Sequence, residues 1–104
     1  MKKENLVMTK GNDDKGVTKY IVEGHVNSKN SHAFKYILEN AIRYGETNIV
    51  LNMADVGFLG SDGIRTILKT YKDAEKAGGT FRIEYPSQNV RNALEIMALT
   101  DILI

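Results

Sequence analysis

The chain has 104 residues, a formal net charge of +1, no cysteine and 42% apolar residues. This length and composition are typical of one globular domain, residues 1–104, with a single core. The small net charge excludes a bulk electrostatic attraction to nucleic acid or to a membrane surface, and the lack of cysteine excludes disulfides, thiolate catalysis and cysteine-bound metals.

The first elements predicted along the chain are two strands. No apolar segment long enough for a signal peptide or a membrane span follows the charged N-terminus, so we expect a cytoplasmic protein. Residues 6–10 and 17–23 are rich in β-branched and aromatic side chains, which favour strands. Residues 11–16 have the composition of a turn, and the short connection predicts an antiparallel hairpin.

A helix and a buried strand are predicted next. Residues 24–28 are expected to break the second strand. Four apolar residues at helical spacing then predict one helical face: Phe34, Ile37, Leu38 and Ala41. Ser28, Asn30 or Ser31 are candidates for its N-cap, and Gly45 is placed to end it. Residues 47–53 are apolar on both sides at their centre, as expected for a central strand.

The C-terminal half predicts two more helices with a strand between them. The first helix has an apolar stripe made by Ile64, Ile67, Leu68, Tyr71 and Ala74. Residues 80–85 alternate strictly and predict a strand with one face in solvent. Pro86 ends that strand, Ser87 is a good N-cap, and a third stripe follows: Val90, Ala93, Leu94 and Met97. Residues 102–104 are a candidate last strand.

This order of elements predicts an α/β fold. Alternating strands and helices imply right-handed crossovers and a mostly parallel sheet. We therefore expect a mixed sheet of four to five strands, an N-terminal antiparallel hairpin and about three helices packed on the sheet.

The turn after the central strand carries the most informative residue, Ser61. Residues 58–65 join that strand to the second helix, which places Ser61 at the start of the helix. There a serine is exposed and lies near the positive end of the helix dipole. It can act as a structural N-cap, worth about 1 kcal/mol over alanine, or as a switch, because a phosphate would reverse the local charge.

These segments together resemble the STAS domain family, in particular bacterial anti-sigma factor antagonists. The resemblance rests on residues 48–53 and 56–65, and it continues through Tyr71-Lys72, Gly78-Gly79 and Pro86-Ser87 to the closing residues 98–104. Residues 24–27, Gly-His-Val-Asn, align with a Gly-Glu-Leu-Asp turn of the family. The resemblance covers the chain from about Leu6 to its end.

The resemblance implies a binding module and not an enzyme. In its unphosphorylated form such a protein binds an anti-sigma factor that is also a serine kinase of the GHKL type, and this releases a sigma factor. The kinase phosphorylates the serine that falls on Ser61, and a PP2C-type phosphatase removes the phosphate. The protein itself would hold no cofactor or metal and supply no catalytic residue, since the kinase binds the ATP. The partner surface is expected to comprise Asn27, Gly60, Ser61, Asp62, Gly63 and Arg65.

Three residues depart from the family pattern. Switching antagonists usually have Asp before the serine, Ser or Thr after it, and Asp in the early turn, where this chain has Gly60, Asp62 and Asn27. Asp62 would repel a phosphate on Ser61. A STAS module that binds partners without a switch therefore remains an alternative.

Other chemistries have weaker support. Asp55 after the central strand could accept a phosphoryl group as in a receiver domain, with Asp13 and Asp14 as a magnesium pair, but turn composition and the hairpin position favour simple turn residues. His25 and His32 do not have metal-ligand spacing, and neither is tied to Ser61 in a catalytic triad.

Overall fold

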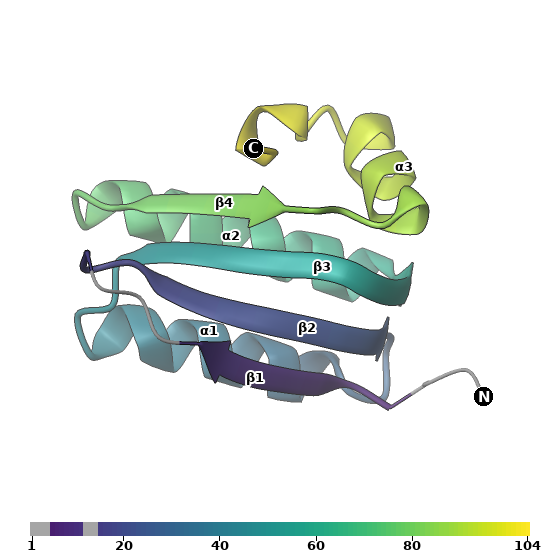
Figure 1. The fold of residues 1–104 in the computed structure, drawn as a ribbon, viewed down its shortest axis with the longest axis horizontal. Coiled ribbons are helices and arrows are strands. Elements are labelled where there is room, and N and C mark those ends of the chain that lie inside the picture. The colour runs from purple at the N-terminus through teal and green to yellow at the C-terminus, as the bar shows by residue number, and fades with distance from the viewer. Residues whose placement is uncertain (1–4, 12–14) are drawn as a thin grey trace.

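The centre of the fold is a sheet with strand order β1-β2-β3-β4. A computed structural model describes residues 5–11 and 15–104. The strands are β1 (Val7–Gly11), β2 (Thr18–Val26), β3 (Asn48–Leu59) and β4 (Thr80–Glu84). β1 pairs with β2 antiparallel, while β2, β3 and β4 run parallel (Figure 1). The predicted mixed sheet with an N-terminal hairpin is confirmed; the predictions for residues 1–4 and 12–14, which include Asp13 and Asp14, lie outside the described residues.

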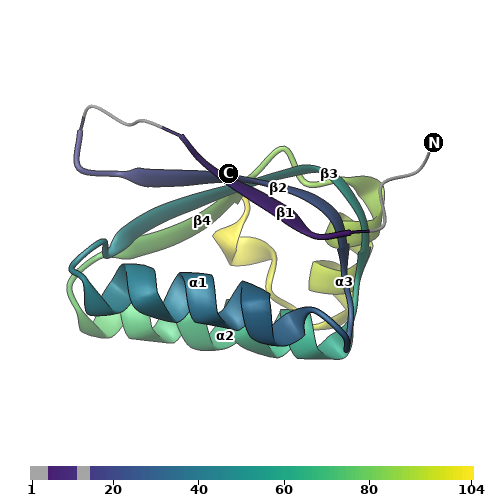
Figure 2. The same cartoon turned by 90° about the horizontal axis from the view of Figure 1, so that it is seen from below.

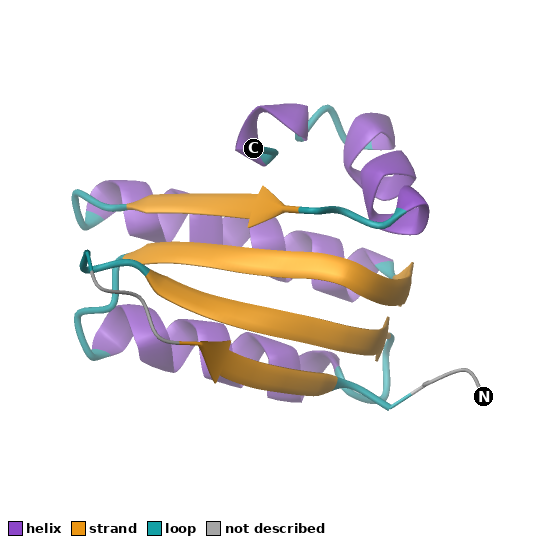
Figure 3. Ribbon diagram, viewed as in Figure 1, coloured by secondary structure: helices purple, strands orange, loops and turns teal. Residues whose placement is uncertain are grey.

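Two long helices cover one face of this sheet. α1 (Ser31–Arg43) connects β2 to β3, and α2 (Ser61–Lys76) connects β3 to β4. They lie side by side on the same face (Figure 2). Because both helices connect parallel strands, both begin on the same side of the sheet, at the C-terminal ends of β2 and β3. The shorter α3 (Gln88–Ile96) packs against β3. In Figure 3 it is the short helix that lies beyond the end of β4.

The core fills the space between the sheet and the two long helices. Three of the four residues of the predicted α1 face are buried, Phe34, Leu38 and Ala41, and Ile37 is partly buried. The central strand β3 contributes Ile49 and Leu51, as its apolar sequence predicts. Burial of such side chains is the main favourable contribution to folding, at about 25 cal/mol per Å² of apolar surface.

Strands β2 and β3 are longer than predicted. Residues 24–26 continue β2 and do not break it, and β3 extends to Leu59 and not to residue 53. The pairing between β2 and β3 shifts register twice, so two extra residues are inserted on the β3 side. Such bulges interrupt the two-residue alternation on which the prediction depended.

The helical faces and the C-terminus also differ from the prediction in detail. In α2 the buried face includes Thr66 and Thr70, whereas Leu68 and Tyr71 are only partly buried. Met97 follows α3 and is 50% exposed, so the third stripe does not reach it. Residues 100–102 form a short 3₁₀ helix, and in place of a last strand there is one bridge between Leu103 and Ile83.

Candidate functional site

The candidate site is formed by the two turns that follow β2 and β3. Val26 and Leu59 are paired at the ends of these neighbouring strands. The backbone N–H of Gly60 then donates a hydrogen bond to the carbonyl oxygen of Val26, at 2.9 Å. This bond holds the Asn27 turn beside the Ser61 turn, so two of the predicted site segments, 33 residues apart in sequence at Asn27 and Gly60, lie next to each other.

Ser61 is exposed at the beginning of α2. Gly60, in an extended conformation (φ −81°, ψ 175°), is the N-cap, and Ser61 is the first helical residue. The interpretation of Ser61 as a structural N-cap is therefore wrong, because the cap position is one residue earlier. Its hydroxyl makes no hydrogen bond with a described residue, so it is free to react with or bind another molecule.

Gly63 fixes the distance between α2 and the strand ends. A Cβ atom at this position would lie 2.7 Å from Leu59 Cδ1 and 2.7 Å from Val26 Cγ1, closer than carbon atoms can pack. Only glycine lets the first turn of α2 approach this closely. Gly63 is buried, so it positions the turn that carries Ser61 and offers no exposed surface of its own.

Charged groups beside Ser61 are paired within α2. Asp62 Oδ1 lies 2.9 Å from Arg65 Nη1, and both side chains are exposed enough that the pair adds little stability. The carboxylate of Asp62 also lies in the first turn, where the helix dipole favours a negative charge. The pair can therefore rearrange when another charge arrives.

Asn27 is engaged in its own turn. Its side-chain oxygen accepts hydrogen bonds from the backbone N–H groups of Lys29 (3.0 Å) and Asn30 (3.2 Å). The side-chain oxygen of Asn30 in turn accepts from the backbone N–H of Asn27, at 2.9 Å. These reciprocal bonds make the turn rigid, and they use the Asn27 oxygen for local structure.

One exposed aromatic residue, Phe58, also lies at this site and is not among the residues predicted from the sequence. Phe58 is 49% exposed, and its ring lies 6.1 Å from the ring of His25 on the neighbouring strand. An exposed phenylalanine three residues from Ser61 is the kind of side chain that partners bury in an interface. The exposure of Phe58 could not be predicted from the sequence, because the β3 bulges turn two consecutive residues, Gly57 and Phe58, away from the core.

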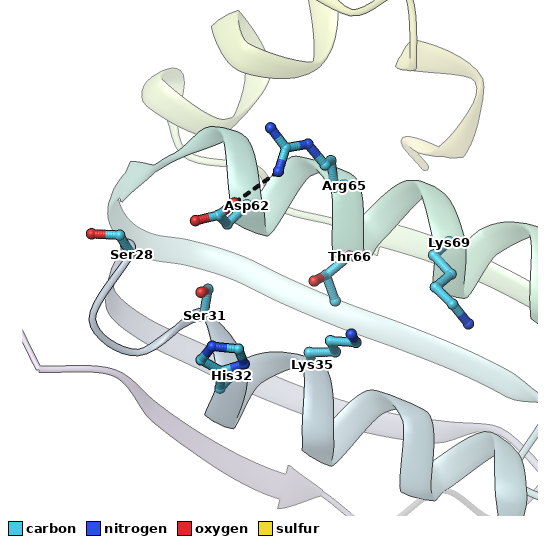
Figure 4. A pocket seen from close by; sticks show the side chains of 8 residues that line it. All are labelled: Ser28, Ser31, His32, Lys35, Asp62, Arg65, Thr66 and Lys69. Carbon is cyan, nitrogen blue, oxygen red and sulfur yellow. Dashed lines mark hydrogen bonds and ion pairs between the residues drawn. The ribbon is translucent and has the colours of Figure 1, made fainter.

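A cleft lies beside these turns, between the first halves of α1 and α2 (Figure 4). Lys69 borders it and forms ion pairs with Asp73 (2.7 Å) and Glu39 (3.7 Å). The hydrogen bond to Asp73 raises the pKa of the Lys69 ammonium group above its ordinary value. Lys69 is therefore charged at neutral pH.

The residues considered for other chemistry lie away from this site or lack partners for it. Asp55 lies within β3, opposite Glu23 of β2, so it does not follow a strand as a receiver phosphoacceptor would. Within residues 5–11 and 15–104, no cluster of three or more His, Asp or Glu side chains is suited to hold a metal ion. No helix in the same part of the chain is long and apolar enough to cross a bilayer.

Comparisons with known proteins identify the family. The fold resembles that of the anti-sigma factor antagonist SpoIIAA in its unphosphorylated form, with a TM-score of 0.83 and 18% identity over 94% of this chain and 86% of that chain. It also resembles an anti-sigma factor antagonist of Mycobacterium paratuberculosis, with a TM-score of 0.82 and 20% identity over 95% of this chain and 83% of that chain. The Bacillus cell fate determinant SpoIIAA in its phosphorylated form has a TM-score of 0.77 and 17% identity over 94% of this chain and 89% of that chain. A search of curated proteins gives no significant match. The family model of the STAS domain matches residues 9–103, and the chain therefore belongs to the STAS domain family.

Proposed function

We propose that the protein is an anti-sigma factor antagonist that phosphorylation of Ser61 switches off. The observation that carries this proposal is the exposed hydroxyl of Ser61, which starts α2 and makes no hydrogen bond with a described residue. A partner can reach such a group without local unfolding. The similarity in fold to antagonists, one of which has a phosphorylated form, supports the same role.

The unphosphorylated protein would bind an anti-sigma factor that is a GHKL-type serine kinase, and this would release a sigma factor in the cytoplasm. The docking surface would comprise the exposed parts of both turns, with Phe58 as an apolar anchor beside Ser61 and with Arg65 and Asn27 at its border. Gly60 and Gly63 would contribute by setting the positions of the backbone.

The chemical step would use catalytic groups of the partner alone. The oxygen of the Ser61 hydroxyl would attack the γ-phosphorus of ATP held by the kinase, the bond from that phosphorus to the bridging oxygen would break, and ADP would leave. The hydroxyl proton would pass to a base of the kinase. A PP2C-type phosphatase would use water to restore the hydroxyl and release inorganic phosphate. The protein is thus a substrate and a binding module, not an enzyme.

Phosphorylation would change binding through charge. It adds about −1.5 to −2 charges at neutral pH next to the carboxylate of Asp62, which is already paired with Arg65. To turn a nearly fully bound complex into a nearly fully free one, the two forms must differ by about 5 kcal/mol in affinity. Burying an uncompensated dianion against a partner costs several kcal/mol, which is enough for this change.

Intact-mass spectrometry after incubation with a cognate GHKL-type kinase and ATP tests the proposal. We expect the mass to rise by one phosphoryl group, Ser61→Ala to abolish the rise, and Ser28→Ala to leave it unchanged. Ser28 is a matched control because it is an exposed serine in the adjacent turn. Persistent phosphorylation of Ser61→Ala would contradict the assignment of this residue.

A non-switching STAS binding module is the second candidate function. It is favoured by Asp62, whose exposed carboxylate follows Ser61 directly and opposes a phosphate there. In that case the partner would bind with equal affinity before and after incubation with ATP, and no mass change would occur.

A further inference from the structure

The cleft between α1 and α2 has the size and position of a small-molecule site. Its volume is about 380 Å³, within the usual range for ligand pockets. It lies along the first halves of both helices, which begin at the same edge of the sheet. The positive ends of two helix dipoles therefore point toward one end of the cleft and favour an anion there, while the Asp62 carboxylate at that end is paired with Arg65.

Two mostly buried residues present hydroxyl groups without protein partners to this cleft. Ser31 of α1 and Thr66 of α2 are each only 8% exposed, and neither side-chain oxygen is hydrogen-bonded to a described residue. Neither oxygen is sealed in the interior, since the described residues contain no fully buried side-chain polar atom that lacks a partner. Figure 4 shows both side chains at the wall of the cleft. Each oxygen is therefore open to the cleft, where a bound molecule can accept a hydrogen bond from its hydroxyl group.

A lysine side chain lies about one helical turn from each of these two hydroxyl groups. Lys35 follows Ser31 by four residues on α1, and Lys69 follows Thr66 by three residues on α2, so each pair shares a helix face. Lys35 forms no ion pair with a described residue. Arg65 gives one nitrogen to Asp62 and keeps its other N–H groups for a further acceptor.

We propose that this cleft binds the phosphomonoester of a small molecule. The hydroxyls of Ser31 and Thr66 and the cations Lys35 and Arg65 would donate hydrogen bonds to the phosphoryl oxygens from two sides, and the guanidinium group suits a phosphate because its donors form a planar fork. The cleft volume equals that of roughly a dozen water molecules in the liquid, so room remains for a small organic group attached to the phosphate. This ligand site is separate from Ser61, which does not line the cleft.

The two buried threonines of α2 provide a matched pair of variants. Thr66→Val removes a hydroxyl that faces the cleft and keeps the shape of the side chain. Thr70→Val removes a hydroxyl that donates to the carbonyl oxygen of Thr66 (2.7 Å) and does not line the cleft. Because hydrogen bonds to charged groups are strong, we expect Thr66→Val to weaken binding about tenfold and Thr70→Val to leave it unchanged.

The experiment is a titration of the ¹⁵N-labelled protein followed by amide chemical shifts, with glycerol 3-phosphate, inorganic phosphate and glycerol as separate probes. We expect saturable shifts in residues 31–35 and 62–69 with glycerol 3-phosphate, weaker binding of inorganic phosphate, and no saturable shift with glycerol. Tighter binding of inorganic phosphate than of the ester would overturn the assignment to a phosphomonoester, and the absence of saturable shifts would overturn the site.

The exposed Lys35 keeps the test decisive if Thr66→Val does not fold. Lys35→Gln removes a charge from the surface of α1, where a substitution of this kind has little effect on stability. We expect it to weaken binding of glycerol 3-phosphate at least fivefold. Equal affinities of Lys35→Gln and the unchanged protein would contradict the proposed ligand contacts.

Discussion

The starts of helices α2 and α3 use serine in opposite ways. At α3, Ser87 is the N-cap: its hydroxyl oxygen accepts a hydrogen bond from the N–H of Val90 at 3.2 Å and donates one to the carbonyl oxygen of Val56 at 2.6 Å. At α2 the N-cap is Gly60, and Ser61, one residue later, makes no hydrogen bond with a described residue. A shift of one residue thus separates a hydroxyl used for folding from one that is available to a partner.

The third helical residue also differs between the two helices, in how it packs. In α3 it is Val90, which is fully buried and fills space against the sheet. In α2 it is Gly63, which leaves no side chain and brings the backbone close to Val26 and Leu59. The start of α3 is fixed by side-chain packing, whereas the start of α2 is fixed by the close approach of the backbone.

The largest effect is expected when α2 is given the packing of α3 by Gly63→Val. The new side chain would overlap Leu59 and Val26, and overpacking of this kind destabilises by about 3 kcal/mol. The free energy of unfolding in urea measures it. Lys72→Val on the exposed face of α2 is the control for a valine in this helix that makes no steric overlap, and it should cost about 0.5 kcal/mol through the lower helix propensity of valine than of lysine. Equal losses for both variants would show that Gly63 is not needed for packing.

A smaller loss of stability than for Gly63→Val is expected from Ser87→Ala. This change removes the cap of α3 and leaves the Val56 carbonyl without its hydroxyl donor, so we expect about 2 kcal/mol of destabilisation in urea unfolding. Ser87→Asn, which can still cap the helix, should recover part of the loss. A loss below about 0.5 kcal/mol for Ser87→Ala would mean that the capping bonds contribute little.

A small gain in stability is expected from Gly60→Ser, which gives α2 a serine N-cap like that of α3. The backbone of Gly60 is already extended as an N-cap requires, and serine exceeds glycine there by a few tenths of a kcal/mol. A new Cβ would lie 3.1 Å from Phe58 Cε2, and the half-exposed ring has room to move. Thermal unfolding should show a slightly raised Tm; a lowered Tm would show that Phe58 holds its position.

The smallest effect on stability is expected from Ser61→Ala. Its hydroxyl has no partner among the described residues, so the free energy of unfolding should change by less than about 0.5 kcal/mol. A loss comparable to that of Ser87→Ala would mean that Ser61 has a structural role and would weaken the case for a switch.

The sequence predicted the elements that obey a simple period and missed those that do not. The α1 face and the alternation of β4 follow directly from apolar spacing, and the exposed position of Ser61 follows from a strand that is succeeded by a helix. The second half of β3 was missed because each bulge replaces the two-residue alternation by a three-residue step, from Met53 to Val56 and from Val56 to Leu59.

Features that depend on contacts between two segments could not be predicted from the sequence either. Thr66 and Thr70 are polar, so the apolar stripe of α2 excluded them, although both are buried against neighbouring elements. The cleft depends on Ser31 and Thr66 facing each other from two helices, and no spacing within one helix indicates this. The contact between Phe58 and His25 likewise depends on the register between β2 and β3.

The hydrogen bond from Gly60 to Val26 gives experimenters a convenient reporter. The amide proton of Gly60 is held by a carbonyl of the adjoining strand, so it should exchange slowly with deuterium for as long as the two turns stay joined. The same amide immediately precedes Ser61, so its resonance should also move when that side chain is modified. One glycine peak would then record, without any attached dye, both the covalent state of the serine and the opening of the edge that carries it.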